Sequence, residues 1–112
     1  MKAGQLTERM RFEKRASIAG DGYGNFEGDW QAQFTVAAQR QMLRGGETVI
    51  AARLNGRQPA ILTIRRSAQS ETITTDWRAV DTRAGDVWNI RSISPSEDRA
   101  SFDLLVERGV AP

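Results

Sequence analysis

The sequence predicts a mainly-β fold, a small β-barrel or sandwich of about six strands with one short helix and long loops. Short segments in which apolar and polar residues alternate recur at regular spacing, and turn-forming residues separate them. Only one segment has the apolar spacing of a helix. Because 112 residues suit one compact domain, we expect residues 1–112 to form a single domain.

The first predicted strand covers residues 9–15, where Met10 and Phe12 alternate with charged side chains. This alternation indicates a half-buried strand with a charged outer face. The glycine-rich segment 19–30 follows and is predicted to be a turn region. A second strand is expected over about residues 33–41, where apolar residues alternate again.

In the segment 44–59 the spacing of apolar residues changes from the alternation of a strand to the spacing of a helix. Two glycines open it, an Asn-Gly pair lies near its end, and Ile50 and Leu54 form an i, i+4 apolar pair. Glu47 would lie in the first turn, where the helix dipole favours an anion. These features predict a short helix, and a flexible loop with partial helicity is the alternative.

The C-terminal half is predicted to be a strand, a loop and a hairpin, followed by a closing strand. The strand covers residues 58–66, and the polar stretch 67–75 is a loop or a frayed strand. Residues 76–95 resemble a hairpin. Trp88 and Ile90 fall on even positions and Ile93 on an odd position, and this change of register indicates a β-bulge. Residues 100–108 alternate once more and are predicted to close the fold.

The lack of cysteine and histidine excludes several classes of function. The chain cannot form disulfides or Cys/His zinc sites, and it has no histidine to act as a general base near neutral pH. Its acidic residues are scattered singly, so we expect no enzyme, no metal site and no cofactor. No apolar run approaches the roughly 20 residues of a membrane span, and no membrane partner is expected.

The charged residues are nearly balanced, with 16 cations against 14 anions and a net charge of +2. Only Lys2 and Lys14 are lysines, so arginine supplies almost all the positive charge. A GC-rich genome would explain this bias. A guanidinium-rich surface that faces carboxylates or phosphates is the functional alternative.

An ordered set of motifs from about Gly4 to Glu107 resembles a known family. The motifs are, in order, Gly4-x-Leu6-x-x-Arg9, Asp-Gly-Tyr-Gly-Asn at 21–25, Trp30, Gly46-Glu47, LTIRR at 62–66, DWRAV at 76–80 and VWNIRSI at 87–93. This set is similar to that of the phage head–tail joining proteins, also called head-closure or stopper proteins.

The resemblance implies a small β-barrel that acts as a structural protein of the virion, at the head–tail junction of a phage, a prophage or a gene transfer particle assembled in the bacterial host cytoplasm. It implies a homo-oligomeric ring, six- or twelvefold, below the portal and adaptor proteins. That ring would close the DNA-filled head, hold packaged double-stranded DNA without sequence specificity, and offer a surface to the tail terminator and tail tube proteins. The alternatives are a free nucleic-acid-binding barrel and another tail-tube or connector component.

The segment around the predicted helix is the candidate channel or stopper element. Its glycines would act as hinges and its arginines would face the DNA backbone. The candidate residues are Arg44, Gly45, Gly46, Arg53, Asn55, Gly56 and Arg57. The alternative is an ordinary surface helix that packs Ile50 and Leu54 on the sheet.

The candidate subunit interface combines the aromatic residues of the glycine-rich segment with a pair of arginines, namely Tyr23, Phe26, Trp30, Arg65 and Arg66. Aromatic anchors among small polar residues are typical of interface cores. The aromatic side chains could instead fold back onto the barrel. A phosphate-binding loop is disfavoured because the lysine of such a loop is missing, and base stacking is disfavoured by the neighbouring acids. Arg65 and Arg66 could form a salt bridge between subunits, or they could lie in solvent at the end of their strand.

Overall fold

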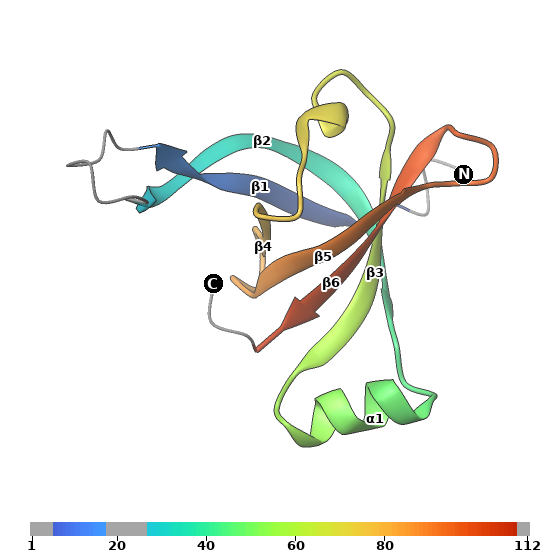
Figure 1. Ribbon diagram of the computed structural model, residues 1–112. Helices are drawn as coiled ribbons and strands as arrows, with labels where there is room; N and C mark the ends of the chain where they lie inside the picture. Colours follow the sequence, from blue (N-terminus) through green and yellow to red (C-terminus); the bar gives the residue numbers. More distant parts are fainter. Residues whose placement is uncertain (1–5, 18–26, 110–112) are drawn as a thin grey trace.

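Six antiparallel strands form a closed barrel in the computed structural model, which describes residues 6–17 and 27–109 (Figure 1). Around the barrel the strand order is β1-β2-β3-β6-β5-β4, so β4 returns to pair with β1. The elements in chain order are β1 (Glu8–Ser17), β2 (Glu27–Met42), α1 (Glu47–Leu54), β3 (Gln58–Arg65), the 3-10 helix η2 (Ser70–Thr72), β4 (Arg78–Asp81), β5 (Val87–Pro95) and β6 (Ser101–Arg108). The predicted mainly-β fold is confirmed, and the barrel is the form it takes.

Most predicted elements are confirmed, with differences at their ends. The second strand begins at Glu27, so residues 27–30, which were expected in a turn, belong to β2. Of the two alternatives for the polar stretch 67–75, the loop is confirmed and the frayed strand is wrong, and the loop contains the 3-10 helix η2. The predicted bulge in β5 lies between Ile90 and Ser92, where the register with β6 shifts. The early start of β2 arises because pairing with β1 extends it into a sequence whose glycines favour a turn.

The strand β2 belongs to two ladders in succession. Its first part pairs with β1 up to Ala38, and its pairing with β3 begins at Ala38 and continues to Met42. The outer ends of β1 and β2 extend past the ladder with β4 and project from the barrel as a two-stranded arm (Figure 1). The strands β2 and β3 therefore separate beyond the pair Ala38–Ile64.

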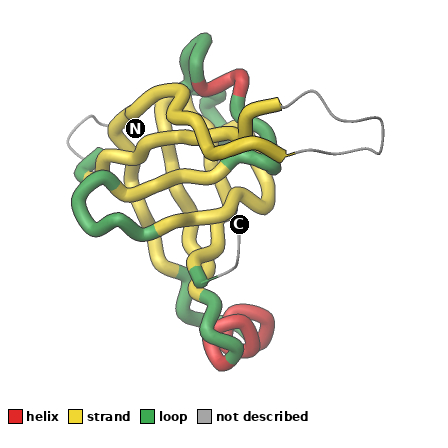
Figure 2. Tube along the Cα trace, turned by 90° about the vertical axis from the view of Figure 1, so that its left-hand side faces the viewer, coloured by secondary structure: helices red, strands yellow, loops and turns green. Residues whose placement is uncertain are grey.

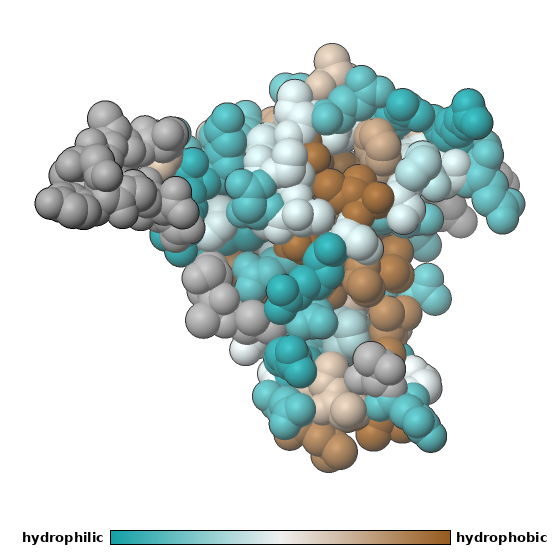
Figure 3. Space-filling model, in the orientation of Figure 1, coloured by the Kyte–Doolittle hydropathy of each residue, from teal (hydrophilic) through white to brown (hydrophobic). Residues whose placement is uncertain are grey.

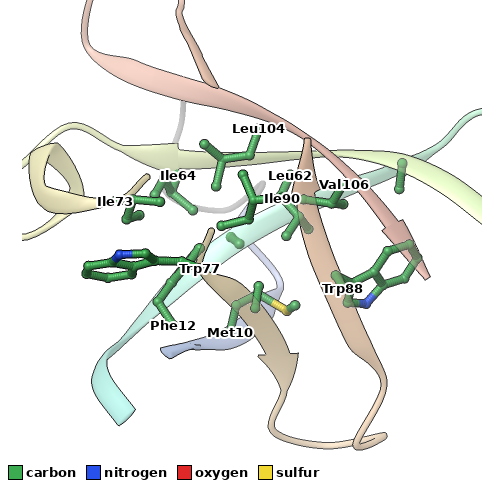
Figure 4. Close-up of a cluster of buried hydrophobic side chains, with 13 residues drawn as sticks. Met10, Phe12, Leu62, Ile64, Ile73, Trp77, Trp88, Ile90, Leu104 and Val106 are labelled. Carbon is green, nitrogen blue, oxygen red and sulfur yellow. The ribbon is translucent and has the colours of Figure 1, made fainter. Parts of the chain in front are cut away.

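The barrel interior is filled by apolar side chains from all six strands and from the segment that leads into β4 (Figure 4). Alternate residues of the strands point inward, as the period of two requires, and Phe12 packs against Phe34 with ring centroids 5.4 Å apart. Of the three tryptophans, Trp77 and Trp88 belong to the core and Trp30 is only half-buried. The buried cluster is Met10, Phe12, Ala38, Ala60, Leu62, Ile64, Ile73, Trp77, Ala79, Trp88, Ile90, Leu104 and Val106.

The helix α1 lies outside the barrel, at one end, between β2 and β3 (Figures 1 and 2). The predicted helix is confirmed, but the alternative that packed Ile50 and Leu54 on the sheet is wrong. Ile50 is 50% exposed and Leu54 is 82% exposed, whereas the small side chain of Ala52 is buried. Among the described residues, no helix has both the length and the hydropathy of a membrane span.

The same substitution at two leucines should separate core packing from surface exposure. Leu62 is fully buried, so Leu62→Ala should lower the free energy of unfolding by about 2–5 kcal/mol, through lost burial and the cavity that remains. Leu54→Ala is the matched control and should change it by less than about 0.5 kcal/mol. Urea unfolding followed by tryptophan fluorescence measures both, and equal losses would contradict the structure.

Candidate functional site

The segment from Arg44 to Arg57, here called the α1 projection, is the most prominent feature outside the barrel (Figure 2). Two glycines with positive φ bound its helix. Gly46, at φ 88°, precedes the first turn, and its carbonyl accepts a hydrogen bond from the Ile50 N–H at 3.0 Å. Gly56, at φ 80°, ends the helix in a conformation that glycine adopts without strain.

The helix C-terminus forms a Schellman motif. The N–H of Gly56 donates to the carbonyl of Arg53 at 3.0 Å, and the N–H of Arg57 donates to that of Ala52 at 2.9 Å. These two bonds satisfy carbonyls that the end of a helix would otherwise leave unpaired. The Asn-Gly pair that marked the helix end in the sequence is therefore a helix stop.

The base of the α1 projection is held to the barrel by several contacts. The N–H of Leu43 donates to the carbonyl of Pro59 at 3.2 Å, and the Gln58 side chain donates to the carbonyl of Leu43 at 3.0 Å. Arg57 lies 3.9 Å from Glu107 of β6, and Gly109 lies close to the carbonyl oxygen of Gly56. These contacts set the direction in which the helix leaves the barrel.

The α1 projection brings together the seven residues of the predicted channel element, and its arginines differ in their surroundings. Arg44 and Arg53 are exposed, so their guanidinium groups are accessible to a partner. Arg57 is half-buried and turned toward Glu107. The positive charge available to a phosphate therefore comes from Arg44 and Arg53.

A second cluster surrounds Trp30 where the arm meets the barrel. The guanidinium of Arg78 lies 4.4 Å from the ring centroid of Trp30, and that of Arg15 lies 4.8 Å from it. Arg78 also donates to the Glu13 carboxylate at 2.8 Å. Of the predicted interface residues, Tyr23 and Phe26 lie outside the described residues. The sequence did not reveal this cluster, because its members come from β1, β2 and β4 and meet only when β4 pairs with β1.

Glu13 is buried, with 6% of its surface exposed, although it was expected on the charged outer face of its strand. Burial raises the pKa of Glu13, but hydrogen bonds and positive charge from Arg78 and Arg11 outweigh burial, and the pKa lies below its ordinary value of 4.5. The distance from Arg11 Nε to the carboxylate is 2.7 Å. Glu13 is therefore a charged group that the fold requires in its ionised form.

Asp81 holds the turn between β4 and β5 in a similar way, at 3% exposure. Its carboxylate accepts the backbone N–H of Arg83 at 2.8 Å and that of Ala84 at 3.2 Å, and Arg40 lies 3.1 Å away. Burial raises the pKa of Asp81, but these hydrogen bonds and the charge of Arg40 bring it below its ordinary value of 3.8.

The two arginines at the end of β3 have different environments. Arg66 pairs with Glu71 at 2.9 Å and lies over the ring of Phe102, so this chain already supplies its partner. Arg65 is exposed and lines a cavity of about 460 Å³ on the side where β2 and β3 separate. Within the described part of the chain, no group of three acidic side chains is placed to hold a metal ion.

The fold and the site define a small closed β-barrel protein with a projecting helix and exposed arginines. The model of the phage head completion protein family matches residues 1–108, and the chain belongs to this family. It is accordingly a structural component of the virion and assembles with other proteins of the phage head or tail. The expected relationship to the head–tail joining proteins is thereby confirmed.

Two solved structures share the fold. The solution structure of a protein from Shigella flexneri 2a has a TM-score of 0.71 and 20% identity, and the match covers all of both chains. A chain from the virion of a native gene transfer agent has a TM-score of 0.66 and 17% identity, with 95% of this chain and 97% of that chain covered. No curated protein matches this chain.

Stability should fall in acid, because the folded state lowers the pKa of Glu13 and Asp81. A lowered pKa adds stability above the ordinary values of 4.5 and 3.8, and this contribution is lost as the pH falls below them. Glu13→Gln should lower the free energy of unfolding by about 1.5–3 kcal/mol at pH 7, and by less at pH 3. Urea unfolding at several pH values measures this, with the exposed Glu97→Gln as control. If Glu13→Gln lowers the free energy of unfolding equally at both pH values, the lowered pKa of Glu13 is contradicted.

Gly109 should tolerate no side chain, because it adopts φ 88° and a Cβ there would clash with the Gly56 carbonyl oxygen. Gly109→Ala should therefore lower the free energy of unfolding by about 1–2 kcal/mol, from the backbone conformation alone. Gly45→Ala is the control, since a Cβ there meets no atom within 4 Å and its φ is not positive. Thermal unfolding compares the two variants, and an equal melting temperature for both would refute the contact.

Proposed function

We propose that this head completion protein forms a homo-oligomeric ring below the portal and adaptor of the DNA-filled head. The ring closes the head after packaging, retains the DNA and provides the surface to which the tail attaches. The observation that carries this proposal is the match of the head completion family over nearly the whole chain, together with a rigid barrel from which one helix-bearing segment projects.

The charges of the α1 projection support a role in DNA retention. Arg44 and Arg53 are exposed and would meet phosphates in a ring channel, where the contact depends on charge and reads no base sequence. That indifference suits a protein that must hold whichever DNA end has been packaged. Two exposed arginines per chain, repeated around a ring, would place a circle of positive charge around the duplex.

A closed barrel also suits a ring subunit that must resist mechanical force. Each strand of the barrel pairs with two neighbours, so a pull on one loop is shared by the ladders on both sides. The loops and the α1 projection can then contact different neighbours while the barrel keeps its shape. Contacts with the portal and adaptor on one side and with the tail on the other need surfaces of this kind.

Particles produced without this chain should lose their packaged DNA and fail to join tails. Quantitative PCR of nuclease-protected DNA and electron microscopy of the particles measure the two effects. Particles that keep their DNA and carry tails in the absence of the chain would overturn the proposed function.

Substitution of the exposed arginines should weaken DNA retention without preventing ring formation. The double variant Arg44→Gln/Arg53→Gln should lower nuclease-protected DNA several-fold, because phosphate contacts are lost. The control is Arg99→Gln, in the turn between β5 and β6 at the other end of the barrel (Figure 1). Equal retention in both variants, with the ring present, would exclude these arginines from the DNA contact.

A further inference from the structure

The outward face of α1 is apolar. Ile50 and Leu54 are one turn apart on that face, and Ala51 lies beside them and is also exposed. Ala52, on the opposite side of the helix, faces the barrel and is buried. Figure 3 shows hydrophobic residues at the lower tip of the molecule, where Figure 1 places α1. The helix thus presents its larger apolar side chains to the outside and its smallest to the barrel.

This face does not have the chemistry of a DNA contact. Glu47, in the first turn, lies about 20° from Leu54 around the helix and would repel phosphates. Arg53 lies at the edge of the face, about 100° from Leu54 and about 60° from Ile50. Adjacent apolar side chains on a projecting helix indicate a protein partner, and an apolar ridge with i, i+4 spacing fits an apolar cavity or groove.

The same chain carries an open cavity at the other end of β3. Its lining is part apolar (Leu6, Val36 and Ala37) and part polar (Thr35, Ser67 and Gln69), and Arg9 and Arg65 add positive charge. It lies where β2 and β3 separate beyond Ala38, and its volume is about 460 Å³. Arg9 and Arg65 are both exposed, so their guanidinium groups can donate hydrogen bonds to an incoming carboxylate.

We infer that α1 of one copy inserts Ile50 and Leu54 into this cavity of the next copy in the ring, with Glu47 directed at Arg9 and Arg65. The inference rests on the proposed ring. Helix and cavity are different surfaces of one chain, which is what a head-to-tail contact around a closed ring requires. Arg53, on the flank of the helix, stays available for DNA.

The helix of one copy cannot fill the cavity of the same copy. The strand β3 begins next to α1 at Gln58 and reaches the cavity at Arg65, seven residues later, a distance of about 23 Å. Contact between the helix face and the cavity is therefore a contact between two chains. A cross-link between these positions reports on that contact alone.

The lack of cysteine makes this contact directly testable. Two differently tagged chains, one with Leu54→Cys and one with Ala37→Cys, are assembled together in particles and treated with a short bismaleimide linker. The expected result is a covalent dimer that carries both tags. The pair Leu54→Cys and Ser92→Cys is the matched control and should give no such dimer, because Ser92 is exposed on β5, which lies across the barrel from β2 in the strand order. Leu54 is exposed, so this change should leave the fold intact.

Charge reversal tests the orientation of the helix. In the cross-linking pair, Glu47→Arg on the Leu54→Cys chain should lower the yield of the covalent dimer several-fold, and so should Arg65→Glu on the Ala37→Cys chain. Combining the two reversals should restore the yield, because the opposite charges meet again. An unchanged yield with each single reversal would overturn the pairing of Glu47 with Arg65.

The outcomes separate this inference from the proposed function. Rings that form in the particle neck without the two-tag dimer would overturn the helix-to-cavity contact and leave the ring intact. Particles in which the chain is present but forms no ring would overturn both. A two-tag dimer with the Leu54→Cys and Ala37→Cys pair, absent from the control pair, supports the contact.

Discussion

Closure of the barrel depends on a short ladder between β1 and β4, the first and fourth strands of the chain. Only four residue pairs join them, from Met10–Asp81 to Glu13–Arg78. The last of these pairs is also an ion pair, with Arg78 Nε 2.8 Å from a carboxylate that is almost completely buried. Such a carboxylate is costly to remove from water unless it is paired, so it favours the one register in which Arg78 lies opposite. The closed strand order and the core enclosed by the described strands depend on that ladder.

Closure also decides which surfaces remain for contact with other molecules. Strands that pair on both sides have no free edge to offer a partner, so docking within the barrel proper must use side chains and connections. The connection between β2 and β3 became a helix that points its apolar face outward, and the separation of the same two strands opened a cavity. Both features arise from β2, which leaves one ladder and enters the next at Ala38.

A head completion protein is a structural component of the virion, and the surfaces described above suit contacts through shape and charge. Exposed arginines on the α1 projection suit a polyanion, and an apolar ridge on the same projection suits a neighbouring subunit. The two proposed roles use different parts of the helix, because Arg53 lies at the edge of the apolar face, about 100° from Leu54 and about 60° from Ile50. In the proposed ring, one short helix would therefore serve both a subunit contact and a DNA contact.

The sequence by itself determined the fold class, the strands and the helix. Alternation of apolar and polar residues, and the turn residues between the strands, are local signals that a single sequence is enough to show. The ordered motifs were enough to indicate the family as well. The tertiary structure alone decided that the sheet closes, that Glu13 is buried beside Arg78 and Arg11, and that two guanidinium groups lie near the Trp30 ring. It also decided that Ile50 and Leu54 face outward, where their spacing had equally allowed packing on the sheet. The physical reason is that periodicity shows which residues share a face, whereas pairing between distant strands determines what that face meets.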